Sequence, residues 1–129
     1  MEYLSGEDIL VMHSEIVDAT GGTHGIRDTE LFISIIERPK ASFGGTEMHA
    51  TVFAKAAVYL ESLAQYHVFI DGNKRTALAA SARFLFVNGY DLTASNTEVE
   101  VFVLRTVEEK LGLEEIADWF ESNVKRINS

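Results

Sequence analysis

Apolar residues recur at intervals of three and four positions along most of the chain, and this spacing is typical of helices that bury one face. Six such segments can be distinguished, separated by glycine, proline or asparagine. Their apolar residues are Ile9, Leu10, Ile16 and Val17; Leu31, Phe32, Ile35 and Ile36; Val52, Phe53, Ala56, Ala57, Leu60, Leu63 and Ala64; Leu78, Ala82, Leu85 and Phe86; Val99, Phe102 and Val103; and Ile116, Trp119, Phe120 and Val124. The pattern predicts an all-α fold.

Capping and breaking residues place the ends of the first two helices. Ser5 and Asp8 have the spacing of a capping box, so the first helix is expected to begin there. The glycine pair at 21–22 is expected to end it. The second helix is expected over roughly 28–37, because Pro39 cannot continue a helix.

The remaining helices follow from the same kinds of signal. The stretch 38–45 contains a proline and a glycine pair, so a loop or short hairpin is expected there. Thr46 is the expected cap of the third helix, which is apolar around much of its circumference and is therefore expected to be central. A fourth helix is expected over 76–88, Asn96 is the expected cap of the fifth, and Gly112 separates the fifth from the sixth.

Length and composition support one folded unit. The chain has 129 residues, of which 47% are hydrophobic and 24% charged, so a single domain over 1–129 with a substantial core is expected. It has no cysteine, which excludes disulfides, thiolate catalysis and zinc–thiolate sites. Because no long apolar stretch occurs at the N-terminus or elsewhere, a soluble, cytoplasmic protein without a membrane span is expected.

The overall charge indicates that nucleic acid is not a direct binding partner. The formal net charge is −9 and the sequence pI is about 4.8. That sign opposes binding along a nucleic-acid backbone, so no direct nucleic-acid contact is expected. Lys74 and Arg75 are therefore a local positive spot on an acidic molecule.

The densest group of reactive side chains lies in the segment 67–75, which reads His-Val-Phe-Ile-Asp-Gly-Asn-Lys-Arg. A helix is expected directly after it, and the free N–H groups and positive dipole end of a helix N-terminus bind anions. The carboxylate of Asp71 can hold a divalent metal, and His67 can accept a proton. Together these groups suit the transfer of a phosphate-bearing group to a hydroxyl.

A purely structural interpretation explains parts of this segment. His67 alone could be a core histidine, and 71–73 could be a turn and a helix cap. A cap, however, requires neither the histidine nor the two cations Lys74 and Arg75, which the helix dipole disfavours unless an anion lies between them. The spacing is not that of a P-loop.

Other candidate residues lack a second member of a site. His13, His24 and His49 have no partner at the spacing of a zinc-binding helix, so surface or core positions are expected for them. Tyr66 and Trp119 are expected to pack rather than to bind a ligand.

The segment 67–75 resembles the signature of the Fic/Doc (Fido) family, HxFx(D/E)GNxR. The continuation through 78 is similar to the Doc branch, as are 21–28 and 113–119. The resemblance implies a compact bundle of about six helices, the Fido fold, with a small β-hairpin flap at about 38–45.

The family pattern implies a role for each residue of the motif. His67 is implied as the general base, and Asp71 as a ligand of Mg²⁺ that bridges the nucleotide phosphates. Phe69 is implied to pack inward and hold the loop. The implied phosphate-binding residues are Gly72, Asn73, Lys74 and Arg75.

The resemblance also implies a reaction and partners. A Doc-like toxin transfers the γ-phosphate of ATP to a serine, threonine or tyrosine hydroxyl of a protein target such as a translation elongation factor. The flap is implied to bind that target by strand addition, through Lys40, Ala41, Ser42 and Phe43. No glutamate is followed by glycine or asparagine, so the family's self-inhibitory motif is absent and a separate small antitoxin is expected.

Two positions leave the transferred group open. Leu78 stands where adenylylating members carry a second arginine, as in Doc-type proteins. Gly72 matches the adenylylating members, whereas the founding Doc protein has alanine, and glycine is expected to let the backbone approach a phosphate. Protein adenylylation is therefore the alternative reaction, and a non-catalytic module that binds nucleotide or antitoxin is the alternative of another class.

Overall fold

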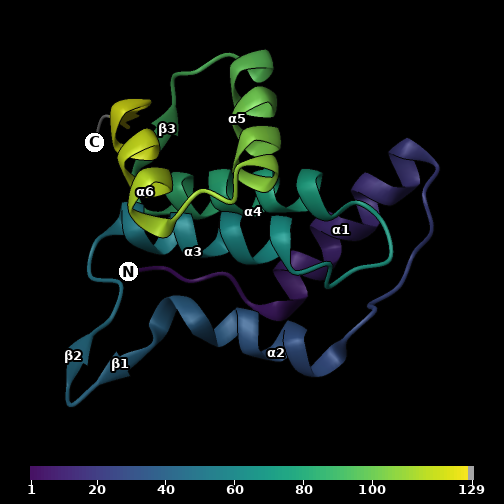
Figure 1. Cartoon of the computed structure of the whole chain (residues 1–129), viewed down its shortest axis with the longest axis horizontal. Coiled ribbons are helices and arrows are strands. Elements are labelled where there is room, and N and C mark those ends of the chain that lie inside the picture. Colours follow the sequence, from purple (N-terminus) through teal and green to yellow (C-terminus); the bar gives the residue numbers. More distant parts are fainter. Residues whose placement is uncertain (128–129) are drawn as a thin grey trace.

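The computed structural model describes residues 1–127 and contains six α-helices and two small antiparallel sheets (Figure 1). The helices are α1 Gly6–Thr20, α2 Thr29–Glu37, α3 Val52–Gln65, α4 Asn73–Val87, α5 Asn96–Glu108 and α6 Leu113–Ser122. The short elements are the 3₁₀ helix η1 Arg38–Lys40 and the strands β1 Ser42–Phe43, β2 Thr46–Glu47, β3 Tyr90–Leu92 and β4 Val124–Arg126. The predicted six-helix bundle is confirmed. No described helix is both long and apolar enough to cross a membrane.

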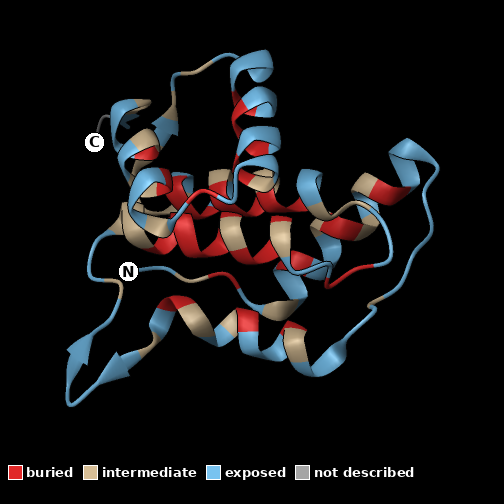
Figure 2. Cartoon of the chain, viewed as in Figure 1, coloured by how far each residue is buried: buried red, intermediate tan, exposed pale blue. Residues whose placement is uncertain are grey.

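Helices α3 and α4 lie side by side at the centre of the molecule (Figure 1). Figure 2 shows that buried residues are concentrated along these two helices. Helices α5 and α6 cover one side of this pair, and α1 and α2 lie on the other. The expectation that α3 is the central helix is therefore confirmed. Two residues expected in the core, Leu10 and Phe86, are instead exposed.

The helix starts test the capping predictions. Ser5 and Asp8 form the expected capping box, with hydrogen bonds in both directions. The predictions for α3 and α5 are wrong by a few residues. Thr51, not Thr46, caps α3 by accepting a hydrogen bond from the N–H of Ala54, because Thr46 is already paired in β2. In α5 the hydroxyl of Ser95 caps the helix, one residue before Asn96.

The sheet β3–β4 was not expected from the sequence. Helix α6 ends at Ser122, and Val124 pairs with Leu92 as part of β4, so the prediction that Val124 continues the last helix is wrong. The two strands are far apart in the chain, and local spacing carries no signal for such a pairing.

The flap is a two-stranded hairpin in which Ser42 pairs with Glu47 and Phe43 with Thr46. The predicted bounds of 38–45 are wrong at both ends, since residues 38–40 form η1 and the second strand extends to Glu47. The hairpin base is tied to α3 by Lys55, which is 1% exposed. The Lys55 ammonium donates to the Pro39 carbonyl and to the Glu47 carboxylate, each at 3.0 Å.

Tyr59 gives a testable pH dependence of stability. Its ring is fully buried in α3, its hydroxyl oxygen accepts the N–H of Leu4 at 3.2 Å, and burial raises its pKa to about 12. A raised pKa favours the protonated phenol in the folded state, so this stabilisation is complete below pH 10 and is lost as pH rises towards 12. Urea unfolding between pH 8 and 11.5 should show a fall of about 2 kcal/mol in the free energy of unfolding. Tyr59→Phe should lack this part of the alkaline loss, and an unchanged pH slope would contradict the assignment.

Candidate active site

The segment 67–75 forms the connection between the central helices α3 and α4 (Figure 1). Residues 68–70 are held in an extended conformation by the chain that precedes α2. The Arg27 N–H donates to the Val68 carbonyl at 2.7 Å, and the Ile70 N–H donates to the Gly25 carbonyl at 3.1 Å. This pairing fixes the motif to the N-terminal third of the chain.

Phe69 lies at the centre of this attachment. Its side chain is buried, stacks on His13 with 3.7 Å between ring centroids, and packs against Phe32 at 5.7 Å. Asn73 closes the loop from the other side. Its side-chain amide accepts the N–H of Phe69 at 2.9 Å and donates to the carbonyl of Phe69 at 3.0 Å. The side chain of Asn73 is thus engaged in the loop, and only its backbone N–H is left for a ligand.

Helix α4 begins at Asn73, three residues earlier than expected, and has no side-chain cap. Gly72 precedes it in the left-handed conformation, with φ of 79°. The first hydrogen bond of the helix runs from the Thr76 N–H to the Gly72 carbonyl, so the N–H groups of residues 73–75 have no acceptor within the helix. The interpretation of 71–73 as a helix cap alone is therefore wrong. The open N-terminus is an anion-binding feature.

A pocket of about 460 Å³ opens at this helix N-terminus. That volume lies within the range of small-molecule binding sites. The motif residues in its wall are His67, Ile70, Asp71, Gly72, Asn73, Lys74 and Arg75, and the rest of the wall comes from Thr20, Gly21, Gly22, Ala64 and Val107. The structure thus brings every predicted catalytic, metal-binding and phosphate-binding residue to one cavity.

His67 is exposed at the edge of this pocket. It has φ of 50°, which is uncommon for a residue with a side chain and costs conformational energy. The fixed residues 68–70 on one side and the end of α3 on the other hold it in that conformation. The imidazole is therefore presented to the pocket without packing into the core.

Lys74 and Arg75 supply positive charge to the pocket. Both side chains are exposed, and neither forms an ion pair with any residue in the range 1–127. Leu78, one turn further along α4, lines a second, smaller cavity together with both cations, Glu100, Val103 and Leu104. The wall next to the cations thus combines apolar side chains with one carboxylate and contains no further arginine.

The Asp71 carboxylate is held from one side. Its Oδ2 atom accepts the N–H of Thr23 at 2.8 Å, which leaves Oδ1 unengaged by the described part of the protein. Gly22 lies so close that a Cβ there would be 3.2 Å from the Asp71 Cβ. No group of three or more acidic, histidine or cysteine side chains that could enclose a metal occurs among the described residues. A single carboxylate fits Mg²⁺, which is commonly held by one or two carboxylates and the oxygens of bound phosphates.

Gly72 has a different role from the one expected. A Cβ at this position would point towards α1, 3.3 Å from Val17 and 3.6 Å from the His13 ring. The expectation that glycine makes room for a phosphate is therefore wrong. Glycine is favoured here because the left-handed conformation strains residues that have a side chain.

The flap residues Lys40, Ala41, Ser42 and Phe43 lie apart from the pocket. The hairpin precedes the first turn of α3, whereas His67 follows its last turn (Figure 1). The 14 residues of α3 place these ends about 20 Å apart. An extended target segment that pairs with the flap needs about six residues to reach His67.

The core position allowed for His13 is confirmed, but sequence reasoning missed the contacts that His13 and Thr23 make with Asp71. His13 is buried and its Nε2 atom lies 2.7 Å from the carbonyl oxygen of Asp71. A signal was present, because His13 stands midway between Ile9 and Val17 on the buried stripe of α1. Thr23 contributes through its backbone N–H, a group that nearly every residue type has, so the sequence contains no signal for this contact.

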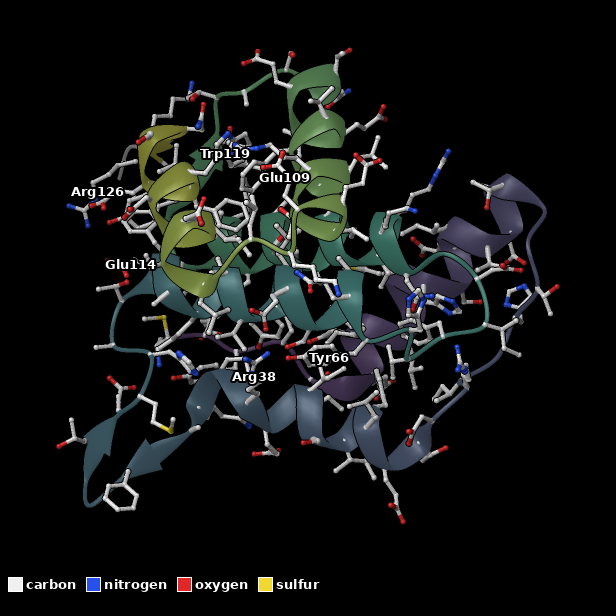
Figure 3. All side chains as sticks on the ribbon, in the orientation of Figure 1. Arg38, Tyr66, Glu109, Glu114, Trp119 and Arg126 are labelled. Carbon is white, nitrogen blue, oxygen red and sulfur yellow. The ribbon has the colours of Figure 1, made fainter. Side chains whose placement is uncertain are left out.

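The other side chains considered from the sequence lie outside the pocket. Arg38 and Tyr66 lie together between α2 and α3 (Figure 3), with the guanidinium 5.7 Å from the ring centroid. Burial raises the pKa of the Tyr66 phenol, and burial together with nearby Arg38 lowers the pKa of His49. His24 is exposed and lies 2.7 Å from Asp18.

Comparisons with known proteins agree with this arrangement. The model of the Fic/DOC family matches residues 3–85, which include α1 through most of α4. The chain is 43% identical over 93 residues to a protein from Mycolicibacterium smegmatis named Toxin Doc, covering 72% of this chain and 69% of that one. It is 35% identical over 89 residues to a protein of Escherichia phage P1 named Protein kinase doc, covering 69% and 70%.

Proposed function

The chain belongs to the Fic/DOC family, and from this premise we propose that it is a Doc-type toxin, a protein kinase that transfers the γ-phosphate of ATP to a hydroxyl of a protein target. The two relatives named above are called a toxin and a protein kinase. The observation that carries the proposal is the single pocket that joins His67, Asp71, the start of α4 without a side-chain cap, and two cations that pair with no acid among residues 1–127.

Each residue of the pocket has a separate role in the proposed reaction. The N–H groups at the start of α4 and the side chains of Lys74 and Arg75 bind the phosphates and stabilise the charge that develops on them. His67 accepts the proton of the target hydroxyl while the oxygen of that hydroxyl forms a bond to the γ-phosphorus. The bond from that phosphorus to the β–γ bridging oxygen breaks, and ADP leaves. Asp71 would hold Mg²⁺ through Oδ1, and the bound metal would neutralise phosphate charge.

Adenylyl transfer is the second candidate. It is favoured by Gly72, because the adenylylating members of the family carry glycine at this position. Two observations oppose it. A Cβ at position 72 would face α1 and not the phosphates, and Leu78 brings apolar surface where adenylylating relatives have a second arginine. The charge around a triphosphate in the adenylylating orientation would therefore be incompletely compensated.

Labelled ATP separates the two reactions. We expect label from the γ-phosphate, and not from the α-phosphate, to appear on a protein when the purified chain is incubated with cell lysate and MgATP. Mass spectrometry should show the addition of phosphate to a serine, threonine or tyrosine. Transfer of α-label with the mass of AMP would establish adenylylation and overturn the kinase proposal.

The partners follow from the same proposal. A translation elongation factor is the expected class of target, and a small antitoxin is expected to hold the protein inactive, because the chain lacks the family's self-inhibitory motif. Addition of the protein encoded beside this one should suppress the transfer of γ-label. Full transfer in the presence of that protein would count against its role as the antitoxin.

The flap is proposed to bind target backbone by strand addition. Its hydrogen-bond pattern identifies the free donors. The Met48 N–H donates to the Ala41 carbonyl at 2.9 Å, so these two residues form a hydrogen-bonded pair. Hydrogen-bonded and non-hydrogen-bonded pairs alternate along an antiparallel hairpin, so the next pair, Ser42 with Glu47, is non-hydrogen-bonded and its backbone groups face outward. The N–H of Ser42 thus faces away from the hairpin and can pair with an added strand.

Ser42→Pro tests the flap without breaking the hairpin. Ala41 has φ of −58° and ψ of 137°, a conformation compatible with a following proline. We expect the KM for the target to rise by about 2- to 10-fold, as for the loss of one hydrogen bond, with the affinity for MgATP unchanged. Ser42→Ala retains the N–H and should behave like the wild type. Equal KM values for the proline and alanine variants would exclude strand addition through β1.

A further inference from the structure

His13 is a buried titratable side chain that the reaction described above does not use. It lies in α1, is 4% exposed, and its ring is stacked at 12° on the ring of Phe69. Its Nε2 atom is 2.7 Å from the carbonyl oxygen of Asp71. A carbonyl oxygen only accepts hydrogen bonds, so Nε2 carries the proton and donates it. The contact joins residues that are 58 positions apart in the chain.

This hydrogen bond fixes the orientation of the peptide group between Asp71 and Gly72. The described chain has no cis peptide bond, and in a trans peptide the C=O and the N–H point in opposite directions. Because the Asp71 carbonyl points towards His13 in the core, the Gly72 N–H points away from it. Asp71 and Gly72 both line the pocket, and no described residue accepts that N–H.

The Asp71 side chain is oriented by a second contact from the same part of the chain. The N–H of Thr23, in the loop after α1, donates to its Oδ2 atom. The backbone of Asp71 is thus held by α1 and its carboxylate by the following loop. Both contacts orient Asp71, the residue proposed to bind the metal. Neither His13 nor Thr23 lines the pocket itself.

We propose that His13 is a positioning residue, which orients the Asp71–Gly72 peptide so that the Gly72 N–H joins the phosphate-binding N–H groups of α4 and the Asp71 carboxylate faces the pocket. The proposal rests on the proposed function in one respect only, that the anion in the pocket is the phosphate chain of a nucleotide. A core histidine of purely structural importance would affect stability. A positioning histidine affects phosphate affinity in a protein that remains folded.

His13→Leu and His13→Gln separate these roles. Leucine keeps the apolar volume and removes the donor, whereas the glutamine amide places an N–H donor near the position of Nε2. We expect His13→Leu to weaken binding of MgATP, measured by calorimetry on the full chain, by about 10- to 100-fold, the usual effect of losing a group that orients a metal ligand. His13→Gln should recover most of this loss. The amide signal of Gly72 in a nitrogen–proton NMR spectrum should move in the leucine variant and return in the glutamine variant.

His24→Leu is the matched control, because His24 is exposed, pairs with Asp18 and lies outside the pocket, so its loss should leave binding unchanged. Thermal unfolding of each variant shows whether the fold is kept. Equal MgATP affinity in the wild type and in a folded His13→Leu protein would overturn the role of His13. Equal loss in the leucine and glutamine variants would also overturn it, since it would show that packing alone matters. A wild type that binds MgATP but transfers no phosphate would count against the proposed function and leave the binding comparison valid.

Discussion

Replacing His67 by alanine is expected to lower phosphate transfer by about 10²–10⁴-fold, the usual effect of losing a general base. The fold and the affinity for MgATP should be largely retained, because the His67 side chain is exposed and makes no hydrogen bond within the described chain. The change removes the proton acceptor and leaves the start of α4 and both cations in place.

The measurement is the initial rate of γ-label transfer at saturating MgATP, together with calorimetric binding of MgATP. His67→Asn is the stringent variant, since asparagine tolerates the left-handed conformation that His67 adopts but is not a base at neutral pH. It should be as inactive as the alanine variant. His24→Ala, at an exposed histidine, serves as the control. A His67→Asn protein with near-normal rates would end the general-base assignment.

Asp71→Asn is expected to weaken binding of MgATP strongly while changing metal-free binding little. An asparagine carbonyl can still accept the N–H of Thr23, so the loop contact can be kept. The other side of the side chain then presents a neutral NH₂ donor to the pocket in place of a carboxylate oxygen. A neutral group is a poor ligand for a hard cation, so we expect a loss of about 10-fold or more in Mg²⁺-dependent affinity.

Titrations of ATP with Mg²⁺ and with a chelator measure this difference. Asp18→Asn is the matched control, because Asp18 is an exposed carboxylate at the end of α1 that pairs with His24. It should behave like the wild type under both conditions. If Asp71→Asn and the wild type gained affinity equally on addition of Mg²⁺, Asp71 would be a structural residue of the loop and not a metal ligand.

The helices and the chemical character of the site were accessible from the sequence because both are local. A helix buries residues three and four positions apart, so the spacing of Ile9, Val17 and their equivalents predicted six helices and a central α3. Ser5 and Asp8 interact within one turn, and their capping box was predicted correctly. The segment 67–75 likewise brings its polar groups together within a single connection.

Contacts between residues that are distant in the sequence could be seen only in the tertiary structure. The pairing of β3 with β4, the attachment of the flap by Lys55 and the contact of Thr23 with Asp71 join separate segments, and no local pattern announces them. The same holds for the direction of a single atom: a Cβ at Gly72 would face α1, and only the packed structure shows this.

Hydrophobic spacing and motif composition act over a few residues, so the set of helices and the reactive groups of one loop could be predicted without a structure. The tertiary structure alone decided how that loop is held. It assigned the Asn73 side chain to the loop backbone and placed His13 against the Asp71 carbonyl. Such contacts arise because burial leaves backbone groups in need of partners, and the partners are whichever polar groups the packed helices bring within reach.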